Sequence, residues 1–186
     1  YPAMPQESYG WEKLHMEHLC GAYREAGWID TKIVRFHNCY GPEGAWEGGR
    51  EKAPAALARK VAYAKMTGDH RVEVWGDGKQ SRSFMHIDDC CEGLYQLMIS
   101  DFAGPVNFGR DRCVEIGAGG LLGIIADTAG VEVKEVNIEG PQGVRSRNSD
   151  NSLCKEILGW EPSIPLEQGM VDTYAWIEEQ VKAKYG

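Results

Sequence analysis

Two kinds of segment alternate along this chain, and the alternation restricts the fold more than any other feature. Short β-branched runs occur at 31–40 (TKIVRFHNCY), 71–75 (RVEVW) and 131–138 (VEVKEVNI), and longer segments between them carry apolar residues at helical spacing. Strands that alternate with amphipathic helices are typical of folds in which helices cover a mostly parallel sheet. The sequence therefore predicts an α/β fold with a partly parallel sheet.

Hydrophobic periodicity and the positions of turn residues predict where the individual helices and strands lie. Helices are expected over about 8–26, 53–65, 88–98, 114–129, 152–159 and 167–184. Further strands are expected at 105–109 and on either side of a turn at Gly76-Asp77-Gly78. Residues 41–51 carry four glycines and no periodicity, so they form a loop at a strand end, which is where α/β proteins bind ligands.

Composition and charge exclude several kinds of partner. The chain has 186 residues, 42% hydrophobic and 26% charged, enough for the core of one ordinary domain or of one and a half small ones. A net charge of −8 argues against a nucleic-acid or membrane-surface binder, so an anionic ligand needs a local basic cluster. Without an apolar run of membrane-spanning length or a signal peptide, the chain is expected to be cytoplasmic.

The cysteines and histidines do not have the spacing of a metal site. The six cysteines include no CxxC pair, so we expect them to be reduced. Glu12, His15 and His18 share one helix face, but no second ExxH completes a di-metal site. We therefore predict no metal.

A glycine-rich stretch at 116–123 (IGAGGLLG) does not match a dinucleotide-binding fingerprint. Gly117 and Gly119 fit, but Leu122 occupies the third glycine position. The chain thus lacks a convincing dinucleotide loop of its own.

Tyr9 and Lys13 form the first candidate catalytic pair. They are spaced i, i+4 on a predicted helix, so their side chains lie on one face. A tyrosine hydroxyl titrates near pH ~10, and a neighbouring ammonium favours the phenolate, which makes it a usable base.

The motifs occur in an order that resembles a known family. SYGWEK, RFHNCYGP, GGREKAPAA, VWGDGKQSRSFMHIDD, VNFG and GVRSRNSDNSLCKEILGW together resemble the extended short-chain dehydrogenases that act on nucleotide sugars, the NAD-dependent epimerase/dehydratase family. The resemblance runs from about residue 5 to residue 180. GPEGAWEGGREKAPAA and GVRSRNSDN resemble the members that act on GDP-mannose.

The resemblance implies a chemistry for three residues. Tyr9 would take the sugar O4 proton while hydride passes to NAD⁺, and Lys13 would hold the nicotinamide ribose. The resulting 4-keto sugar has acidified protons on both neighbouring carbons, so C3 and C5 become invertible. Lys52 matches one member of the family's acid/base pair, whereas none of the six cysteines matches the other.

The resemblance also implies a substrate site and a quaternary structure. The positions matching family contacts to the GDP-sugar are Asn38, Glu51, Lys52, Ala53, Lys60, Gln80, Ser81, Arg82 and Arg147. The residue types alone favour Arg82 and Arg147 as diphosphate ligands, and surface ion pairs for Lys60 and Arg145. Family members commonly pair through the tyrosine helix, so a homodimer is expected.

The expected architecture is the carboxy-terminal part of a Rossmann-type parallel sheet plus a small α/β substrate-binding domain. Residues 1–40, 84–110 and 166–186 would belong to the NAD-binding Rossmann domain, and 41–83 and 111–165 to the nucleotide-sugar domain. The chain begins at Tyr1 rather than methionine, which suggests that the amino-terminal half is absent. We therefore predict that the chain alone binds NAD poorly and does not turn over.

Two other functions stay open at this point. One is a different sugar within the family, as in a UDP-sugar 4-epimerase, a dehydratase or a decarboxylase. The other is a truncated module that binds a nucleotide sugar or drives oligomerisation without catalysis.

Overall fold

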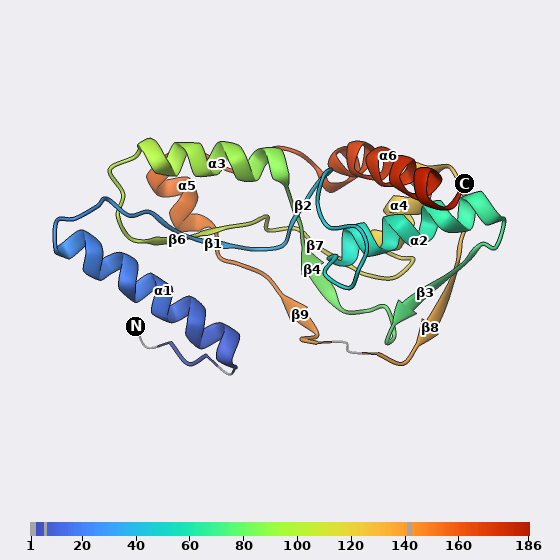
Figure 1. The fold of residues 1–186 in the computed structure, drawn as a ribbon, viewed down its shortest axis with the longest axis horizontal. Coiled ribbons are helices and arrows are strands. Elements are labelled where there is room, and N and C mark those ends of the chain that lie inside the picture. The colour runs from blue at the N-terminus through green and yellow to red at the C-terminus, as the bar shows by residue number, and fades with distance from the viewer. Residues whose placement is uncertain (1–2, 6, 141–142) are drawn as a thin grey trace.

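The computed structural model describes residues 3–5, 7–140 and 143–186, which form two lobes along the long axis of the molecule (Figure 1). In chain order the elements are α1 (Ser8–Glu25), β1 (Ile33–Phe36), β2 (Cys39–Tyr40), α2 (Ala53–Thr67), β3 (Arg71–Trp75), β4 (Ser81–Ser83), β5 (Met85–His86), α3 (Ile87–Ile99), β6 (Pro105–Phe108), β7 (Cys113–Glu115), α4 (Leu121–Ala129), β8 (Lys134–Ile138), β9 (Ser146–Arg147), α5 (Ser152–Leu158) and α6 (Leu166–Tyr185).

The strands pair mostly in parallel. β1 pairs with β6, β2 with β5 and β3 with β8, each in parallel, and β4 lies between antiparallel β7 and parallel β9. β3 and β4, which flank the Gly76–Gly78 turn, pair with other strands and not with each other. The predicted α/β fold with parallel pairing is confirmed.

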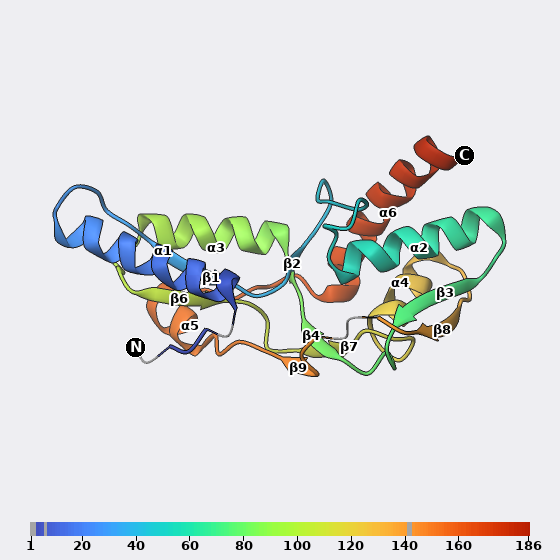
Figure 2. The same cartoon turned by 60° about the horizontal axis from the view of Figure 1, so that its bottom comes forward.

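One lobe is built from three helices over the β3–β8 pair, and Figure 2 shows it at the opposite end of the molecule from α1. Helices α2, α4 and α6 bring together fully buried side chains such as Val61, Leu121, Ile125, Met170 and Ile177. In β3 the side chains alternate, with Val72 and Val74 facing this core and Trp75 left 52% exposed. The core is therefore made where a helix face meets one face of a two-stranded sheet.

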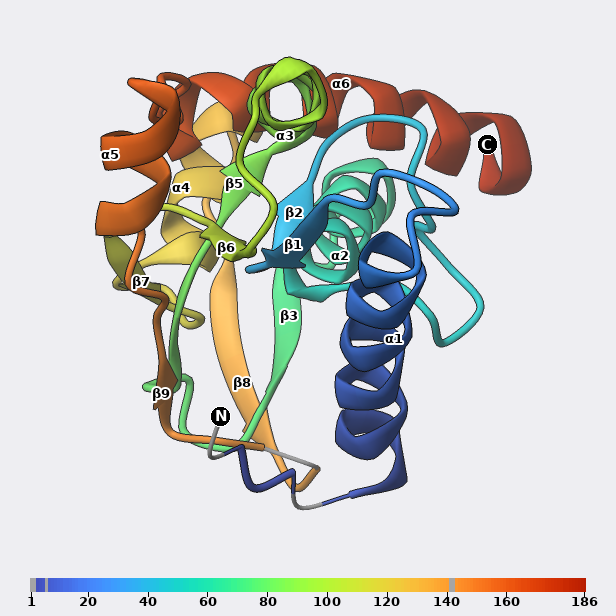
Figure 3. The same cartoon turned by 90° about the vertical axis from the view of Figure 1, so that its left-hand side faces the viewer.

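The other lobe has a smaller core. Met85, Leu97, Val106 and Phe108 are buried between α3, β5 and β6, and Trp160 packs on Phe108 with ring centroids 5.6 Å apart. α5 contributes the buried Cys154 to this cluster. Helix α1 buries no residue and lies at the edge of the lobe that contains β1, β6, α3 and α5 (Figure 3).

The packing groups two helices differently from the predicted domains. α6, placed by sequence with the Rossmann part, packs on α2 and α4, and its buried face belongs to the larger core. α5, placed with the substrate domain, packs with α3 and β6 in the smaller core. Apolar residues at helical spacing reveal that a helix has a buried face, but not which lobe covers it.

The predicted helix over 114–129 was wrong in its first part. Cys113–Glu115 form β7, and the helix begins only at Leu121. At Gly120 a Cβ would lie 2.2 Å from the Glu115 carbonyl oxygen, because the chain folds back closely on itself there. The glycines that dilute the sequence pattern therefore serve a tight connection between strand and helix.

The predicted strand over 31–40 is interrupted. Asn38 has a φ of 51°, a left-handed conformation that separates β1 from β2. Asparagine adopts this conformation more readily than β-branched residues do. β1 and β2 consequently pair with different strands.

Across residues 3–5, 7–140 and 143–186, no helix combines the length and the apolar content that a membrane-spanning segment requires.

Glu178 joins α6 to α2 through a set of hydrogen bonds. Its carboxylate accepts from Tyr174 Oη at 3.0 Å and Lys182 Nζ at 2.7 Å, and Lys65 Nζ of α2 lies at 2.9 Å. Burial opposes ionisation, but the three donors outweigh it and lower the pKa of Glu178 to about 2.

We expect Glu178→Gln to destabilise the chain in a pH-dependent way. Because the carboxyl pKa falls from an ordinary 4.5 to about 2 on folding, the stabilisation is present above pH 4.5 and is lost as the pH falls towards 2. At pH 7 the variant should lose about 2 kcal/mol of unfolding free energy, measured by urea denaturation at several pH values. The exposed Glu179→Gln provides the matched control, and a loss for Glu178→Gln that is constant with pH would contradict the assignment.

Candidate functional site

The site begins where β1 ends. The Asn38 side-chain Nδ2 donates to the Ser83 carbonyl at 3.0 Å, and the Asn38 carbonyl accepts from Met85 N at 3.1 Å. These bonds fasten the left-handed turn to the segment between β4 and β5. Asn38 is therefore held at the carboxyl end of a parallel strand, the usual position of ligands in α/β folds.

Two arginines lie side by side next to this turn. Arg82 and Arg147 are register partners in the parallel β4–β9 pair. Arg82 donates to the carbonyls of Ser81 at 2.7 Å and Val144 at 2.5 Å, whereas the side chain of Arg147 is exposed. Burial and the neighbouring Arg147 charge lower the pKa of Arg82.

His37 lies behind the arginine pair, and sequence reasoning missed it. Its Nδ1 lies 2.8 Å from Ser83 Oγ, and its buried Nε2 has no hydrogen-bonding partner among the described residues. Burial and the charges of Arg147 and Arg82 lower the pKa of His37, so the imidazole is neutral near pH 7. The histidine in RFHN was the available signal, but nothing in that motif places two arginines beside it.

The predicted Gln80 and Ser81 have structural contacts. Gln80 is only 8% exposed, and its Nε2 donates to the Trp75 carbonyl at 2.8 Å. Ser81 N donates to the Arg145 carbonyl at 2.9 Å. Both residues shape the connection that presents Arg82.

The amino terminus of α2 forms a second part of the site. Lys52 is the exposed residue that precedes the helix, Ala53 is its first residue, and Glu51 pairs with Arg59 at 3.2 Å. Lys52 lines a cavity of about 120 Å³ together with Cys39. Because Cys39 follows Asn38 directly, this cavity adjoins the strand end.

Lys60 lies apart from the arginine pair. Its Nζ donates to the Glu73 carbonyl at 2.7 Å, and burial lowers the pKa of Lys60. It lines a surface groove of about 400 Å³ with Arg59, Tyr63 and Arg71. Lys60 thus donates to a carbonyl and not to the expected ion-pair partner, whereas Arg145 forms the expected ion pair, with Asp77 at 2.8 Å.

Tyr9 and Lys13 contact each other as their spacing predicts. Lys13 Nζ lies 5.0 Å from the centre of the Tyr9 ring, and Tyr9 is 70% exposed. Among the described residues, no hydrogen bond or ion pair joins this pair to Asn38 or Lys52. The described part of the chain also contains no cluster of three His, Cys, Asp or Glu side chains that fits a metal.

The glycine-rich loop before α4 is occupied by a carboxylate. Ala118 N donates to Glu135 Oε2 at 2.7 Å, and a Cβ at Gly117 would lie 2.7 Å from the same oxygen. Glu135 thus uses an amide that a pyrophosphate-binding loop would offer to a phosphate.

A larger polar cavity of about 820 Å³ opens beside β9, and residues 148–151 of the GVRSRNSDN motif line part of it. It is lined by Gly109–Arg112, by Asn148–Ser152 and by Cys154, Lys155 and Trp160–Pro162. Its walls are bonded to each other: Asp111 accepts from Asn148 and from Asn151, each at 2.8 Å. The cavity therefore presents groups whose hydrogen bonds are already largely used.

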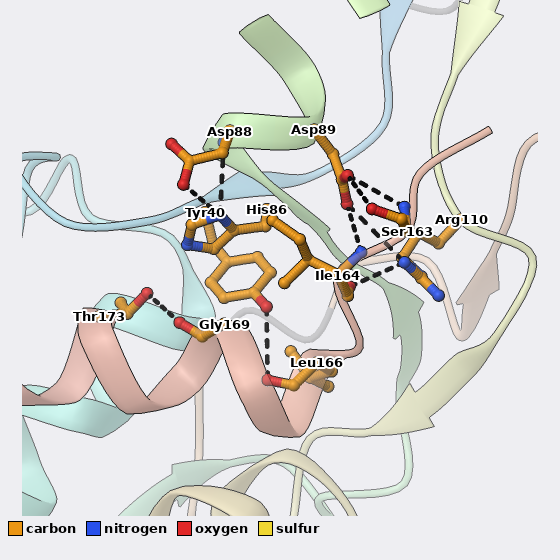
Figure 4. Close-up of polar contacts among 10 residues, drawn as sticks. All are labelled: Tyr40, His86, Asp88, Asp89, Arg110, Ser163, Ile164, Leu166, Gly169 and Thr173. Atoms are coloured by element: carbon orange, nitrogen blue, oxygen red, sulfur yellow. Dashed lines mark hydrogen bonds and ion pairs between the residues drawn. The ribbon is translucent and has the colours of Figure 1, made fainter. Parts of the chain in front are cut away.

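A buried carboxylate fixes the position of the chain between α5 and α6 (Figure 4). Asp89, 5% exposed, accepts from Ser163 N at 3.0 Å, Ser163 Oγ at 3.2 Å and Ile164 N at 2.9 Å. Arg110 lies 3.8 Å away and donates to the Pro162 and Ile164 carbonyls. The segment that leads into α6 is thereby tied to α3.

Tyr40 makes the adjoining contact. Its hydroxyl donates to the Leu166 carbonyl at 3.3 Å, and its ring packs edge-on against His86 at 5.4 Å (Figure 4). Gly169 is needed here, because a Cβ at that position would lie 2.4 Å from Tyr40 Oη. The strand that begins after Asn38 is thus docked on the first turn of α6.

Comparison with known proteins defines the class first. The sequence profile described as "NAD dependent epimerase/dehydratase family" matches residues 1–108, more than half of the chain. The chain belongs to this family.

Individual relatives refine that class. The chain is 49% identical over 182 residues to "GDP-mannose 3,5-epimerase 1" of Oryza sativa subsp. indica, and 48% identical to "GDP-mannose 3,5-epimerase" of Arabidopsis thaliana. Each match covers 98% of this chain and 47% of the relative, so the chain spans about half the length of these relatives. The crystal structure of a Thermotoga maritima UDP-glucose 4-epimerase with UDP-glucose is similar at a TM-score of 0.84 and 25% identity, over 96% of this chain and 55% of that one.

We expect Asp89→Ala to lower the unfolding free energy by about 3 kcal/mol, because it removes the buried carboxylate that accepts from Ser163 N, Ser163 Oγ and Ile164 N and that lies beside Arg110. Chemical denaturation followed by circular dichroism measures the change. Asp88→Ala is the matched control, since the neighbouring Asp88 side chain is 76% exposed and should change stability by less than about 1 kcal/mol. Equal losses in the two variants would contradict the anchoring role of Asp89.

Proposed function

We propose that this chain carries the substrate side of an NAD-dependent nucleotide-sugar epimerase whose sugar nucleotide is GDP-mannose. The observation that carries the proposal is the arginine pair, Arg82 and Arg147, beside Asn38 at the end of β1. The high identity to proteins named GDP-mannose 3,5-epimerase over nearly the whole chain supports the choice of sugar.

The arginine pair suits a diphosphate. Two guanidiniums held in register repel each other, and a bridging anion relieves that repulsion while accepting hydrogen bonds from both. Arg82 is already positioned by backbone carbonyls, so the exposed Arg147 supplies the mobile half of the clamp. This provides the local basic cluster that a chain of net charge −8 needs for an anionic ligand.

The sugar would lie between Asn38 and the start of α2. Lys52, at the mouth of the cavity next to Cys39, is proposed to donate and accept the proton on a sugar carbon. Glu51 is held by Arg59 and Gly49 N, which stabilises the loop that carries Lys52. Lys60 donates to the Glu73 carbonyl of β3, so we assign it no more than an accessory role.

Tyr9 and Lys13 are proposed to act at the sugar C4 and at the cofactor. The Tyr9 hydroxyl is exposed and Lys13 lies over its ring, which fits a pair that contacts a bound ligand. NAD, when bound, supplies the oxidation at C4 that acidifies the C3 and C5 protons. Tyr9 and Lys13 fit the nicotinamide ribose of NAD. The loop at 117–120 does not fit its pyrophosphate, because Glu135 already accepts from Ala118 N. We therefore keep the prediction that this chain alone binds NAD weakly and is inactive.

Two further properties are proposed. A homodimer through α1 is supported by the exposed Trp11 and Met16 on a helix that buries no residue. A cytoplasmic location is supported by six free cysteines. The division into a Rossmann part (1–40, 84–110, 166–186) and a nucleotide-sugar part (41–83, 111–165) also stays a proposal, although α6 packs in the larger core and α5 in the smaller one.

Calorimetric titration of the chain with GDP-mannose, UDP-glucose and NAD⁺ tests the proposal. GDP-mannose should bind more tightly than UDP-glucose, and NAD⁺ weakly. Tighter binding of UDP-glucose would contradict the sugar, and the absence of any nucleotide-sugar binding would contradict the site.

Arg147→Met should weaken GDP-mannose binding by roughly tenfold or more, because it removes charged hydrogen bonds worth about 1.5–3 kcal/mol while keeping side-chain length. Arg145→Met is the matched control, since Arg145 lies two residues before Arg147 and is paired with Asp77. Equal losses in both variants would indicate a general charge effect and not a phosphate clamp.

A further inference from the structure

Two cysteine sulfurs meet between β2 and α3. Cys39 Sγ lies 3.5 Å from Cys90 Sγ and donates a hydrogen bond to it. Cys39 is half-buried and Cys90 is 5% exposed, so the contact belongs to the packed interior and not to a surface where side chains move independently. The fold therefore brings together two thiols that are 51 residues apart in the sequence.

We propose that Cys39 and Cys90 form a reversible disulfide, which makes this pair an oxidation site beside the small cavity that Cys39 and Lys52 line. A disulfide needs its sulfurs about 2.05 Å apart, so the two must approach by about 1.5 Å. Rotation of the two side chains supplies part of that movement, and β2 already packs against α3. The proposal does not depend on the identity of the nucleotide sugar.

A metal ion is a poorer occupant of the pair. Zinc, the metal most often bound by cysteine, needs three or four protein ligands. In the ranges that the structure describes, no third His, Cys, Asp or Glu joins Cys39 and Cys90 in such an arrangement. Covalent pairing is the chemistry that two thiols can complete by themselves.

The neighbouring cavity sets the size of the oxidant. Cys39 lines the cavity of about 120 Å³ that also contains Lys52 and Arg50. Because one water molecule occupies about 30 Å³ of liquid, the cavity admits hydrogen peroxide but not a molecule as large as glutathione disulfide. We therefore take peroxide as the oxidant.

The thiols differ in their surroundings. Cys39 lines the cavity, whereas the buried Cys90 lies behind it at 3.5 Å. The hydrogen bond from Cys39 lowers the pKa of the Cys90 thiol, whereas that contact and burial raise the pKa of the Cys39 thiol. The disulfide is the same product whichever sulfur reacts with peroxide first.

The reaction then balances in two steps. The thiolate of one cysteine attacks one peroxide oxygen, the O–O bond breaks, and the departing hydroxide takes the proton that this thiol released, which leaves water and a sulfenic acid. The sulfur of the other cysteine next attacks the sulfenic sulfur, the S–O bond breaks, and the departing hydroxide takes the proton of the second thiol as a second water. Two thiols are oxidised by two electrons, and one peroxide is reduced to two waters.

The Cys39–Cys90 disulfide would stabilise the segments that connect the two lobes. Cys39 stands between Asn38 and Tyr40, which dock on the β4–β5 segment and on α6 respectively. Linking Cys39 to α3 would fix these two contacts relative to Asp89, one residue before Cys90. The oxidised chain should therefore unfold at a higher temperature than the reduced chain.

Peroxide treatment of the folded chain, followed by alkylation in denaturant and mass spectrometry of the peptides without reduction, tests the proposal. We expect one major product, which has lost the mass of two hydrogen atoms and contains the Cys39 and Cys90 peptides linked to each other. Dithiothreitol should restore both thiols. The same treatment in urea should give mixed pairings, because the native contact is then absent.

Matched variants separate this pair from its neighbour. Cys39→Ala and Cys90→Ala should abolish the linked product and the rise in unfolding temperature, whereas Cys91→Ala, which changes the exposed cysteine next to Cys90, should keep both. The linked peptides are identified in the unaltered chain, so the result stands even where a variant folds poorly. The proposal is overturned if both thiols stay alkylatable, if they become sulfinic acids without a link, or if Cys91 replaces either partner.

Discussion

The Asp89 carboxylate holds the chain at Ser163 and Ile164, and much of the arrangement depends on that contact. The segment it captures leads directly into α6, whose apolar face completes the larger core with α2 and α4. Asp89 itself lies in α3, whose buried face belongs to the smaller core. A buried charge that is fully hydrogen-bonded is costly to displace, so one side chain couples the two lobes.

The proposed site follows from how this coupling positions the strand ends. Tyr40 docks on the first turn of α6, and the left-handed Asn38 docks on Ser83. Between them β2 is short and held at both ends. Ser83, the neighbour of Arg82, accepts from Asn38, and Cys39 lines a cavity with Lys52 at the start of α2. Neutral His37 behind the arginines adds no further positive charge to a place where two guanidiniums already repel each other.

Several features of the molecule were predictable from sequence. Strand–helix alternation predicted the α/β class, the i, i+4 spacing predicted the Tyr9–Lys13 contact, and the ordered motifs predicted the family. The prediction of a helix over 114–129 was wrong at the glycines of 117–120, because the helical pattern continued through residues that form a tight turn against Glu115. The break at Asn38 was also missed, since backbone handedness leaves no mark on hydrophobic periodicity.

The sequence by itself determined the local elements and the chemical types present, because periodicity, turn residues and motif order are properties of neighbouring residues. Tertiary structure alone decided which groups meet. The contacts Arg82–Arg147, Asp89–Ile164 and Cys39–Cys90 join segments separated by 65, 75 and 51 residues in the chain. Such pairings arise when separate helix faces and strand edges bury their surfaces together, and that choice of partners is made by the packed whole and not by any one segment.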